Sequence, residues 1–252
     1  MRIVRFKYRG EENWGIVQPD SIRLLKSPPF PSIRPSSRNI PFKKVKFLPP
    51  AAPSKIILIG LNYRDHAKEL NMPIPKEPVI FMKPVSSLIA CAEDIIYPPM
   101  CARLDYEAEL ALVIKKKAKN IRRLDADKYI LGYTCLNDVT ARDLQKRDGQ
   151  WTRAKSFDTF CPVGPWLETE FDPANARVRA YLNGKLKQDS STRNFIFDIR
   201  FLVCFISKVM TLYPGDLIST GTPAGVGPMR PGDTITIDIS GIARLENRVA
   251  RG

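Results

Sequence analysis

Two glutamates lie two positions apart in the stretch LDYEAELALVI, residues 104–114, which is otherwise mostly apolar. The stretch predicts a β-strand, whose side chains alternate between the two faces with a period of two. Glu107 and Glu109 therefore share a face with Asp105. Two carboxylates at the mouth of a buried sheet supply the oxygen ligands that a hard cation prefers. A solvated strand face would also explain the two glutamates, so the pattern leaves both interpretations open.

Asp138 offers a third carboxylate. It follows the apolar run ILGYTCLN and precedes VTARDLQKR, which predicts a helix. A polar residue between strand and helix often caps the helix, and either Asn137 or Asp138 fits that role. With Glu107 and Glu109, Asp138 would instead complete an all-oxygen triad suited to Mg²⁺ or Mn²⁺.

His66 is the only histidine of the chain, and Glu69 follows three positions later. On a helix these two residues share a face, and the carboxylate would fix the imidazole tautomer and raise its basicity. A surface histidine beside a glutamate is the alternative. Lys155, in the stretch RAKSFDTF, would hold an anion or a developing enolate if it lay near a metal site. An exposed lysine is the alternative interpretation in a chain this rich in lysine.

The stretch TGTPAGVGP, residues 220–228, is rich in glycine but lacks the Gly-Lys-Ser/Thr ending of a phosphate-binding P-loop. Pro223 and Pro228 also do not suit the start of a nucleotide-binding helix. We interpret the stretch as a tight loop whose backbone N–H groups and Thr222 hydroxyl face a small anion. Plain turn chemistry remains the alternative.

Composition limits the class of protein. The chain has 252 residues, 44% of them hydrophobic, which is enough for one large domain with a small appendage. No apolar run approaches the roughly 20 residues of a membrane helix, and the N-terminus has no signal core, so we expect a cytoplasmic protein without membrane contact. The five cysteines form no C-x-x-C pair, which favours buried thiols over a zinc site or disulfides.

The formal net charge of +14 favours an anionic partner, either nucleic acid or a small anionic substrate. The densest basic stretch is KKKAKNIRR, residues 115–123, and it contains no aromatic residue for base stacking. A solvated loop is the favoured interpretation, and we expect no nucleic-acid partner. A basic nucleic-acid-binding protein on a retired enzyme fold remains the rival class.

Two regions differ in pattern. Residues 1–53 contain short strand-like pieces followed by a linker rich in proline and serine, which predicts a small β-containing domain. Residues 54–252 predict a catalytic-sized unit with many strands and few helices, an α+β, β-rich fold with mixed sheets around one core. Within it, YLNGKLKQ predicts a hairpin that turns at Asn183-Gly184, and FDIRFLVCFISKVM predicts an amphipathic helix.

Together these stretches resemble the fumarylacetoacetate hydrolase family. The resemblance rests on ILIGLNYRDHAKEL, LDYEAELALVI, LGYTCLNDVTARDLQ, WTRAKSFDTFCPVGPWL, YLNGKLKQDSST and GDLISTGTPAGVGP, in this order, and covers roughly residues 54–240. It is strongest to short members that act on acylpyruvates, oxaloacetate or carboxymethyl-hydroxymuconate-type diacids, and it implies a mixed β-roll and a role in the catabolism of aromatic compounds.

The resemblance also implies roles for individual residues. It places the metal ligands on Glu107, Glu109 and Asp138, for Mg²⁺ with Mn²⁺ or Ca²⁺ as alternatives. It places a histidine–glutamate dyad on His66 and Glu69 at the start of a mobile lid. Further site residues implied in this way are the active-site Lys155 and the substrate-binding Arg142, Gln145 and Thr222.

The implied reaction is the hydrolysis of a carbon–carbon bond in a 2-oxo acid. His66 would take a proton from water, and Lys155 and the metal would hold the leaving enolate. Isomerisation, decarboxylation of oxaloacetate and tautomerisation use the same enolate, so the residues do not choose between these activities. Family members are usually homodimers, and the same is expected of this chain.

Overall fold

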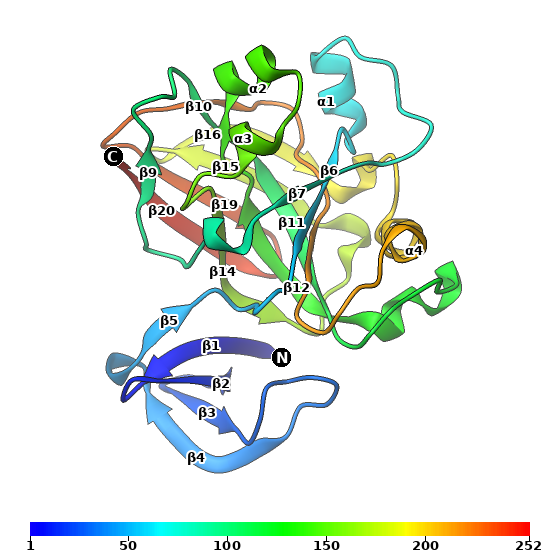
Figure 1. Ribbon diagram of the computed structural model, residues 1–252. Helices are drawn as coiled ribbons and strands as arrows, with labels where there is room; N and C mark the ends of the chain where they lie inside the picture. The colour runs from blue at the N-terminus through cyan, green and yellow to red at the C-terminus, as the bar shows by residue number, and fades with distance from the viewer.

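The computed structural model describes the whole chain, residues 1–252, and β-strands dominate it (Figure 1). The strands of the largest sheet are β1 (Arg2–Tyr8), β2 (Glu11–Val17), β3 (Ser21–Leu25), β4 (Pro35–Pro41), β5 (Lys46–Leu48), β6 (Ile56–Gly60), β7 (Val79–Lys83), β8 (Leu88–Ile89), β11 (Ala108–Ile114), β12 (Ile130–Asn137), β14 (Cys161–Glu168) and β17 (Leu217–Ser219). Its main order is β4-β3-β2-β1-β14-β12-β11-β17-β6-β7, while β5 pairs with β1 and β8 with β14. Both parallel and antiparallel pairs occur, so the predicted mixed, β-rich α+β class is confirmed.

Two smaller sheets complete the roll. Their strands are β9 (Ile95–Tyr97), β10 (Leu104–Tyr106), β13 (Thr140–Ala141), β15 (Arg177–Leu182), β16 (Lys185–Ser191), β18 (Gly227–Met229), β19 (Thr234–Ile239) and β20 (Ala243–Arg251). Strands β13-β10-β18 form one sheet and β16-β15-β19-β20-β9 the other. The predicted hairpin is confirmed as β15 and β16, with Asn183 and Gly184 at positive φ in its turn.

The helices are few and short. The α-helices are α1 (Arg64–Glu69), α2 (Arg142–Asp148), α3 (Thr152–Lys155) and α4 (Ile199–Val209), and five short 3₁₀ helices complete the helical structure. The predicted amphipathic helix is confirmed as α4, which begins after Asp198, whose Oδ1 accepts a hydrogen bond from the Phe201 N–H at 2.9 Å. Its buried face packs into the main apolar cluster, and no helix of the protein is long and apolar enough to cross a membrane.

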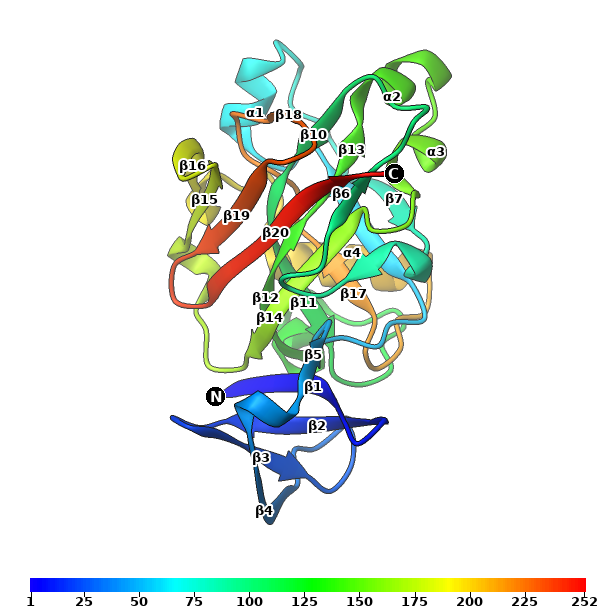
Figure 2. The same ribbon diagram turned by 90° about the vertical axis from the view of Figure 1, so that its left-hand side faces the viewer.

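Strands β1–β5 make a small unit below the main body in Figures 1 and 2. The unit continues the largest sheet, because β1 pairs with β14 through Arg2–Glu168 and Ile3–Leu167. The proline-rich segment that we expected to be a linker contributes β4 and β5 instead. Strand β4 lies at the edge of the sheet, where prolines are tolerated because no neighbour needs their missing N–H groups.

The stretch at residues 104–114, expected to be one strand, is two strands that break at Glu107. The Glu107 N–H donates to the side-chain oxygen of Asn137 at 3.0 Å, in place of a ladder partner. Strand β10 then pairs with β13 and β18, whereas β11 stays in the largest sheet between β12 and β17. Glu107 therefore lies at the corner where the chain changes sheets.

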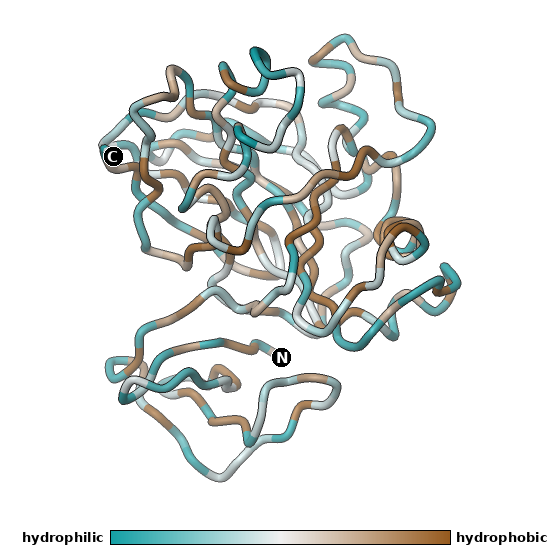
Figure 3. The backbone as a smooth tube through the Cα atoms, viewed as in Figure 1, coloured by the Kyte–Doolittle hydropathy of each residue, from teal (hydrophilic) through white to brown (hydrophobic).

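The apolar side chains form a large cluster inside the main body and smaller ones toward and within the N-terminal unit. In Figure 3 the brown, hydrophobic segments run along the central strands and α4, while the outer loops are mostly teal. The acidic residues at the sheet corner are buried against this apolar background, and such burial requires that their charges be compensated.

Candidate metal centre and active site

Three carboxylates meet at the corner of the sheets. Antiparallel pairing aligns the start of β11 with the end of β12, and the Asp138 N–H donates to the Glu107 carbonyl at 2.9 Å. One oxygen from each of Glu107, Glu109 and Asp138 lies within 4.8 Å of the others. All three residues are buried, with exposed fractions of 6%, 1% and 0%. The solvated-face interpretation of the glutamates is therefore wrong.

Asp138 is also not a helix cap. Helix α2 begins at Arg142, and its N-cap residue, Ala141, offers no side-chain hydrogen bond. Residues Thr140 and Ala141 form β13 first, so Asp138 lies four residues before the helix. The side chain of Asp138 instead points to two lysines.

Lys155, at the end of α3, joins two of the carboxylates. Its Nζ is 3.0 Å from Glu107 Oε2 and 2.5 Å from Asp138 Oδ2. Arg142 donates to the other oxygen of Glu107, and also to Asp105 at 2.9 Å. Burial alone would raise the pKa of Glu107, but the charges of Lys155 and Arg142 outweigh burial and lower it. Burial would lower the pKa of Lys155, but the charges of Asp138 and Glu107 outweigh burial and raise it.

Glu109 has a different environment. Ser219 and the Gly221 N–H donate to its Oε2, at 2.5 and 3.0 Å. These bonds leave Oε1 without a donor from the protein. Burial, then the charges of Asp138 and Glu107, raise the pKa of Glu109 well above its usual range. The triad thus contains one carboxylate whose negative charge no protein cation pairs with.

Lys83, the last residue of β7, is a further charged residue at the site, and the sequence analysis missed it. Its buried Nζ donates to the carbonyls of Val139, Lys155 and Phe160 at 2.8–2.9 Å and lies 2.8 Å from Asp138 Oδ1. Because the three carbonyls take its three hydrogens, Asp138 Oδ1 receives charge compensation but no hydrogen bond. The only signal in the sequence was a lysine that ends an apolar strand.

The residues present fit a divalent cation. Every donor of the triad is a carboxylate oxygen, the ligand type that Mg²⁺, Mn²⁺ and Ca²⁺ share. The buried Asp138 Oδ1 lacks a hydrogen bond, and Glu109 Oε1 has no protein donor. Glu107, Glu109 and Asp138 would therefore hold the ion, with Lys83 and Lys155 beside them as fixed positive charges.

The predicted dyad is formed on α1. His66 Nδ1 lies 2.9 Å from Glu69 Oε2, and Glu69 Oε1 accepts a hydrogen bond from the Gly225 N–H at 2.9 Å. The loop of residues 220–226 thus contacts the dyad through Gly225 and the triad through Gly221. Tyr106 donates to the Gly225 carbonyl at 3.0 Å and fixes the same loop from the other side.

The remaining predicted residues lie on two elements. Arg142 and Gln145 sit one turn apart on α2 and bond to each other at 2.7 Å. Arg142 also donates to Asp105 and Glu107, so its guanidinium fixes the positions of these two carboxylates. Thr222 is buried in the loop and accepts a hydrogen bond from Gln188, a residue that the sequence analysis did not single out.

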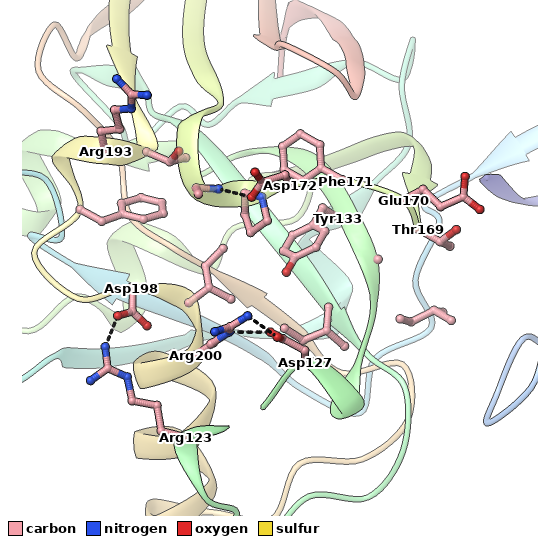
Figure 4. Close-up of a pocket in the computed structure, with 18 of the residues that line it drawn as sticks. Arg123, Asp127, Tyr133, Thr169, Glu170, Phe171, Asp172, Arg193, Asp198 and Arg200 are labelled. Carbon is pink, nitrogen blue, oxygen red and sulfur yellow. Dashed lines mark hydrogen bonds and ion pairs between the residues drawn. The ribbon is translucent and has the colours of Figure 1, made fainter. Parts of the chain in front are cut away.

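A large cavity lies elsewhere on the protein. It measures about 1150 Å³ and lies among β12, the loop after β14 and the start of α4 (Figure 4). Its lining includes none of the predicted site residues, and two of its arginines, Arg123 and Arg200, pair with Asp198 and Asp127. The reactive groups are therefore at the sheet corner and not in this cleft.

A β-rich roll with a buried acidic site where its sheets meet defines the class of the protein. The chain belongs to the fumarylacetoacetate hydrolase family of enzymes, because the family model described as "Fumarylacetoacetate (FAA) hydrolase C-terminal" matches residues 55–250. A second model, "Rv2993c-like, N-terminal", matches residues 1–50.

Solved structures and sequences of known proteins agree with this family. The 5-carboxymethyl-2-hydroxymuconate delta-isomerase of Mycobacterium smegmatis superposes with a TM-score of 0.94 at 40% identity, over all of both chains. Maleylpyruvate hydrolase of Sphingobium sp. SYK-6, in complex with manganese(II) and pyruvate, gives a TM-score of 0.82 at 31% identity, again over both whole chains. The mitochondrial oxaloacetate tautomerase FAHD2B of Homo sapiens is 42% identical over 223 residues, which are 83% of this chain and 71% of that one.

Proposed function

We propose that the protein is a Mg²⁺- or Mn²⁺-dependent enzyme that hydrolyses a carbon–carbon bond in an acylpyruvate-type 2-oxo acid. The observation that carries this proposal is the buried triad with Lys155 between two of its carboxylates. Support comes from the similar maleylpyruvate hydrolase, whose structure holds manganese and pyruvate. The net charge of +14 would also attract a small dianion.

The chain's own residues supply most of the chemistry. When bound, the metal would act as a Lewis acid on the 2-oxo group. The Lys155 ammonium lies beside Glu107 and Asp138 and would stabilise the negative charge that develops on the leaving enolate. His66, held by Glu69 at 2.9 Å, would accept a proton from water, and the hydroxide would add to the acyl carbonyl. The carbon–carbon bond would then break to give a carboxylic acid, and the leaving enolate would take up a proton to become the second product, a 2-oxo acid. The Thr222 hydroxyl would bind the substrate carboxylate, and Gln145 and Arg142 would contact the substrate from α2.

Tautomerisation, isomerisation or decarboxylation is the second candidate. Two similar proteins, the human oxaloacetate tautomerase and the mycobacterial isomerase, favour it. All these reactions need the metal and Lys155, but only hydrolysis needs a base that activates water. Hydrolysis that is lost in His66→Ala would support the first candidate. Turnover of oxaloacetate or of a muconate-type diacid that survives in the same variant would support the second.

The first test is a thermal melt of the full chain with Mg²⁺ or Mn²⁺, with oxalate, and with both. Oxalate resembles a pyruvate enolate, and a ligand that binds only the folded state raises the melting temperature by mass action. We expect the metal and oxalate together to raise the melting temperature more than either does alone. Glu107→Gln should lose this effect, whereas Glu170→Gln, at an exposed carboxylate, should keep it. A wild-type protein that does not respond to metal and oxalate would overturn the proposal.

We further propose that the enzyme works as a homodimer in the cytoplasm and binds neither nucleic acid nor membranes. All five cysteines are free and four of them are buried, which suits a reducing compartment. Light scattering would give the mass of the assembly. A shift of a random RNA oligomer at physiological salt would instead favour the basic-surface alternative.

A further inference from the structure

Gln188, on β16, is a fully buried residue whose side-chain amide nitrogen and oxygen both form hydrogen bonds. Its Nε2 donates to Thr222 Oγ1 and to the Pro223 carbonyl, both at 2.8 Å. Its Oε1 accepts from the Ala108 N–H at 2.9 Å. Ala108 lies between Glu107 and Glu109, so one side chain connects the acidic strand to the loop threonine.

The direction of these bonds determines what the Thr222 hydroxyl can do. A hydroxyl has one hydrogen to donate and two lone pairs to accept with. The Gln188 amide hydrogen occupies a lone pair of Oγ1, because an amide nitrogen can only donate. The Thr222 hydrogen is therefore free to point away from Gln188 and to serve as a donor.

Strand β16 packs tightly against the loop, so this arrangement is rigid. A Cβ atom on Gly225 would come within 2.3 Å of the Lys187 carbonyl, directly beside Gln188. The amide itself has no exposed surface. Flipping it would place its oxygen against the Pro223 carbonyl and its nitrogen against the Ala108 N–H, two unfavourable contacts in a buried position.

We propose that Gln188 is a positioning residue that orients Thr222 as a hydrogen-bond donor to the carboxylate of the bound 2-oxo acid. This inference rests on the proposed function, and it adds the residue that makes the Thr222 hydroxyl a donor and not an acceptor toward the anion. Loss of a hydrogen bond to a charged group weakens substrate binding roughly ten- to hundredfold. Because the carboxylate does not react, the loss falls on KM and leaves kcat almost unchanged.

The test is calorimetric binding of oxalate to the Mn²⁺-loaded full chain, with KM and kcat for the best 2-oxo acid alongside. Gln188→Glu keeps the shape but replaces the donating amide with an acceptor, so the Thr222 hydroxyl would turn toward it. Thr222→Val removes the hydroxyl, and the double variant completes the cycle. Asn247→Asp is the matched control, because Asn247 is an equally buried amide that donates to two carbonyls, of Ala90 and Glu93, away from the acidic site.

We expect Gln188→Glu and Thr222→Val each to weaken oxalate binding and raise KM by a similar factor, and the double variant to be no worse than either. Asn247→Asp should keep wild-type KM.

If wild type binds oxalate and Gln188→Glu binds it equally well, the inference is overturned and the proposed function stands. A double variant weaker than Thr222→Val alone would also overturn it, because Gln188 would then act by charge and not through Thr222. Wild type that binds no oxalate would remove the proposed function and the inference together. If Gln188→Glu does not fold, Gln188→Met, which removes the donor without adding charge, must raise KM in the same way.

Discussion

Replacing Lys83 by methionine should destabilise the metal-free protein strongly. Lys83 Nζ donates to three backbone carbonyls and lies 2.8 Å from Asp138 Oδ1, and its side chain is fully buried. Methionine fills a similar volume, so the change removes charge and hydrogen bonds with little change in packing. Breaking a buried ion pair by removing one partner costs about 3–5 kcal/mol.

For Lys83→Met we expect a loss of unfolding free energy at the lower end of this range. Burial lowers the pKa of Lys83 despite the neighbouring Asp138, which shows that the ammonium itself is unfavourably desolvated. Removing it recovers part of that cost. A loss of about 3 kcal/mol corresponds to a fall in Tm of roughly 6–12 °C for a chain of this length.

Urea unfolding of metal-free protein at neutral pH, followed by tryptophan fluorescence, measures this free energy directly. Lys55→Met is the matched control. Lys55 also pairs with a buried aspartate, Asp216, at 2.5 Å, but Asp216 keeps four other hydrogen-bond donors when Lys55 is lost. We expect this control to lose less stability than Lys83→Met, because those four donors continue to compensate the Asp216 carboxylate. A Lys83→Met protein as stable as the Lys55→Met control would refute the reasoning. Mn²⁺ should stabilise Lys83→Met more than wild type, because the cation compensates Asp138 in place of the lysine.

His66→Ala should lower the kcat of hydrolysis by roughly 10²–10⁴-fold, which is the usual contribution of a general base. Calorimetry should still find Mn²⁺ bound to this variant. Equal kcat in the variant and the wild type would exclude His66 as the base. Burial and the charges of Asp138 and Glu107 raise the pKa of Glu109, so this group destabilises the metal-free fold increasingly as the pH rises from the ordinary glutamate pKa of about 4.3 to the raised one. Metal binding must displace the proton that Glu109 carries below its raised pKa, so Mn²⁺ affinity should rise with pH, and titrations in two buffers of different ionisation enthalpy should show proton release; an affinity independent of pH would contradict this. Gly225→Ala should lower the free energy of unfolding by about 1–3 kcal/mol, measured in urea, and raise KM. Gly225 has φ +95°, and the added Cβ would also collide with the Lys187 carbonyl. Gly232→Ala is the control, because Gly232 has a similar φ with open space around it and so measures the backbone strain without the collision.

Local patterns in the sequence predicted the elements that carry the site. Alternation and turn residues predicted the β15–β16 hairpin, and helical periodicity predicted α4. The spacing of His66 and Glu69 predicted a pair that the structure forms at 2.9 Å. These features depend on residues close together in the chain, where periodicity carries the information.

Features that depend on distant segments could not be predicted in this way. The strand break at Glu107 needs the side chain of Asn137, 30 residues away. Gln188 bonds to residues 34 and 80 positions away, and Lys83 reaches Val139, 56 positions away. A buried amide or lysine has no local pattern of its own, because its partners are set by how the sheets pack. The same packing made Asp138 part of the acidic site and not a cap.

The loop of residues 220–226 has a thermodynamic consequence. Its Gly221 N–H donates to Glu109 and its Gly225 N–H donates to Glu69, so one short segment is bonded both to the acidic triad and to helix α1. An ion at the triad that favoured one position of this loop would also favour the position of α1 that goes with it. Linkage is reciprocal, so any ligand that favoured the same position of α1 would strengthen ion binding by the same free energy.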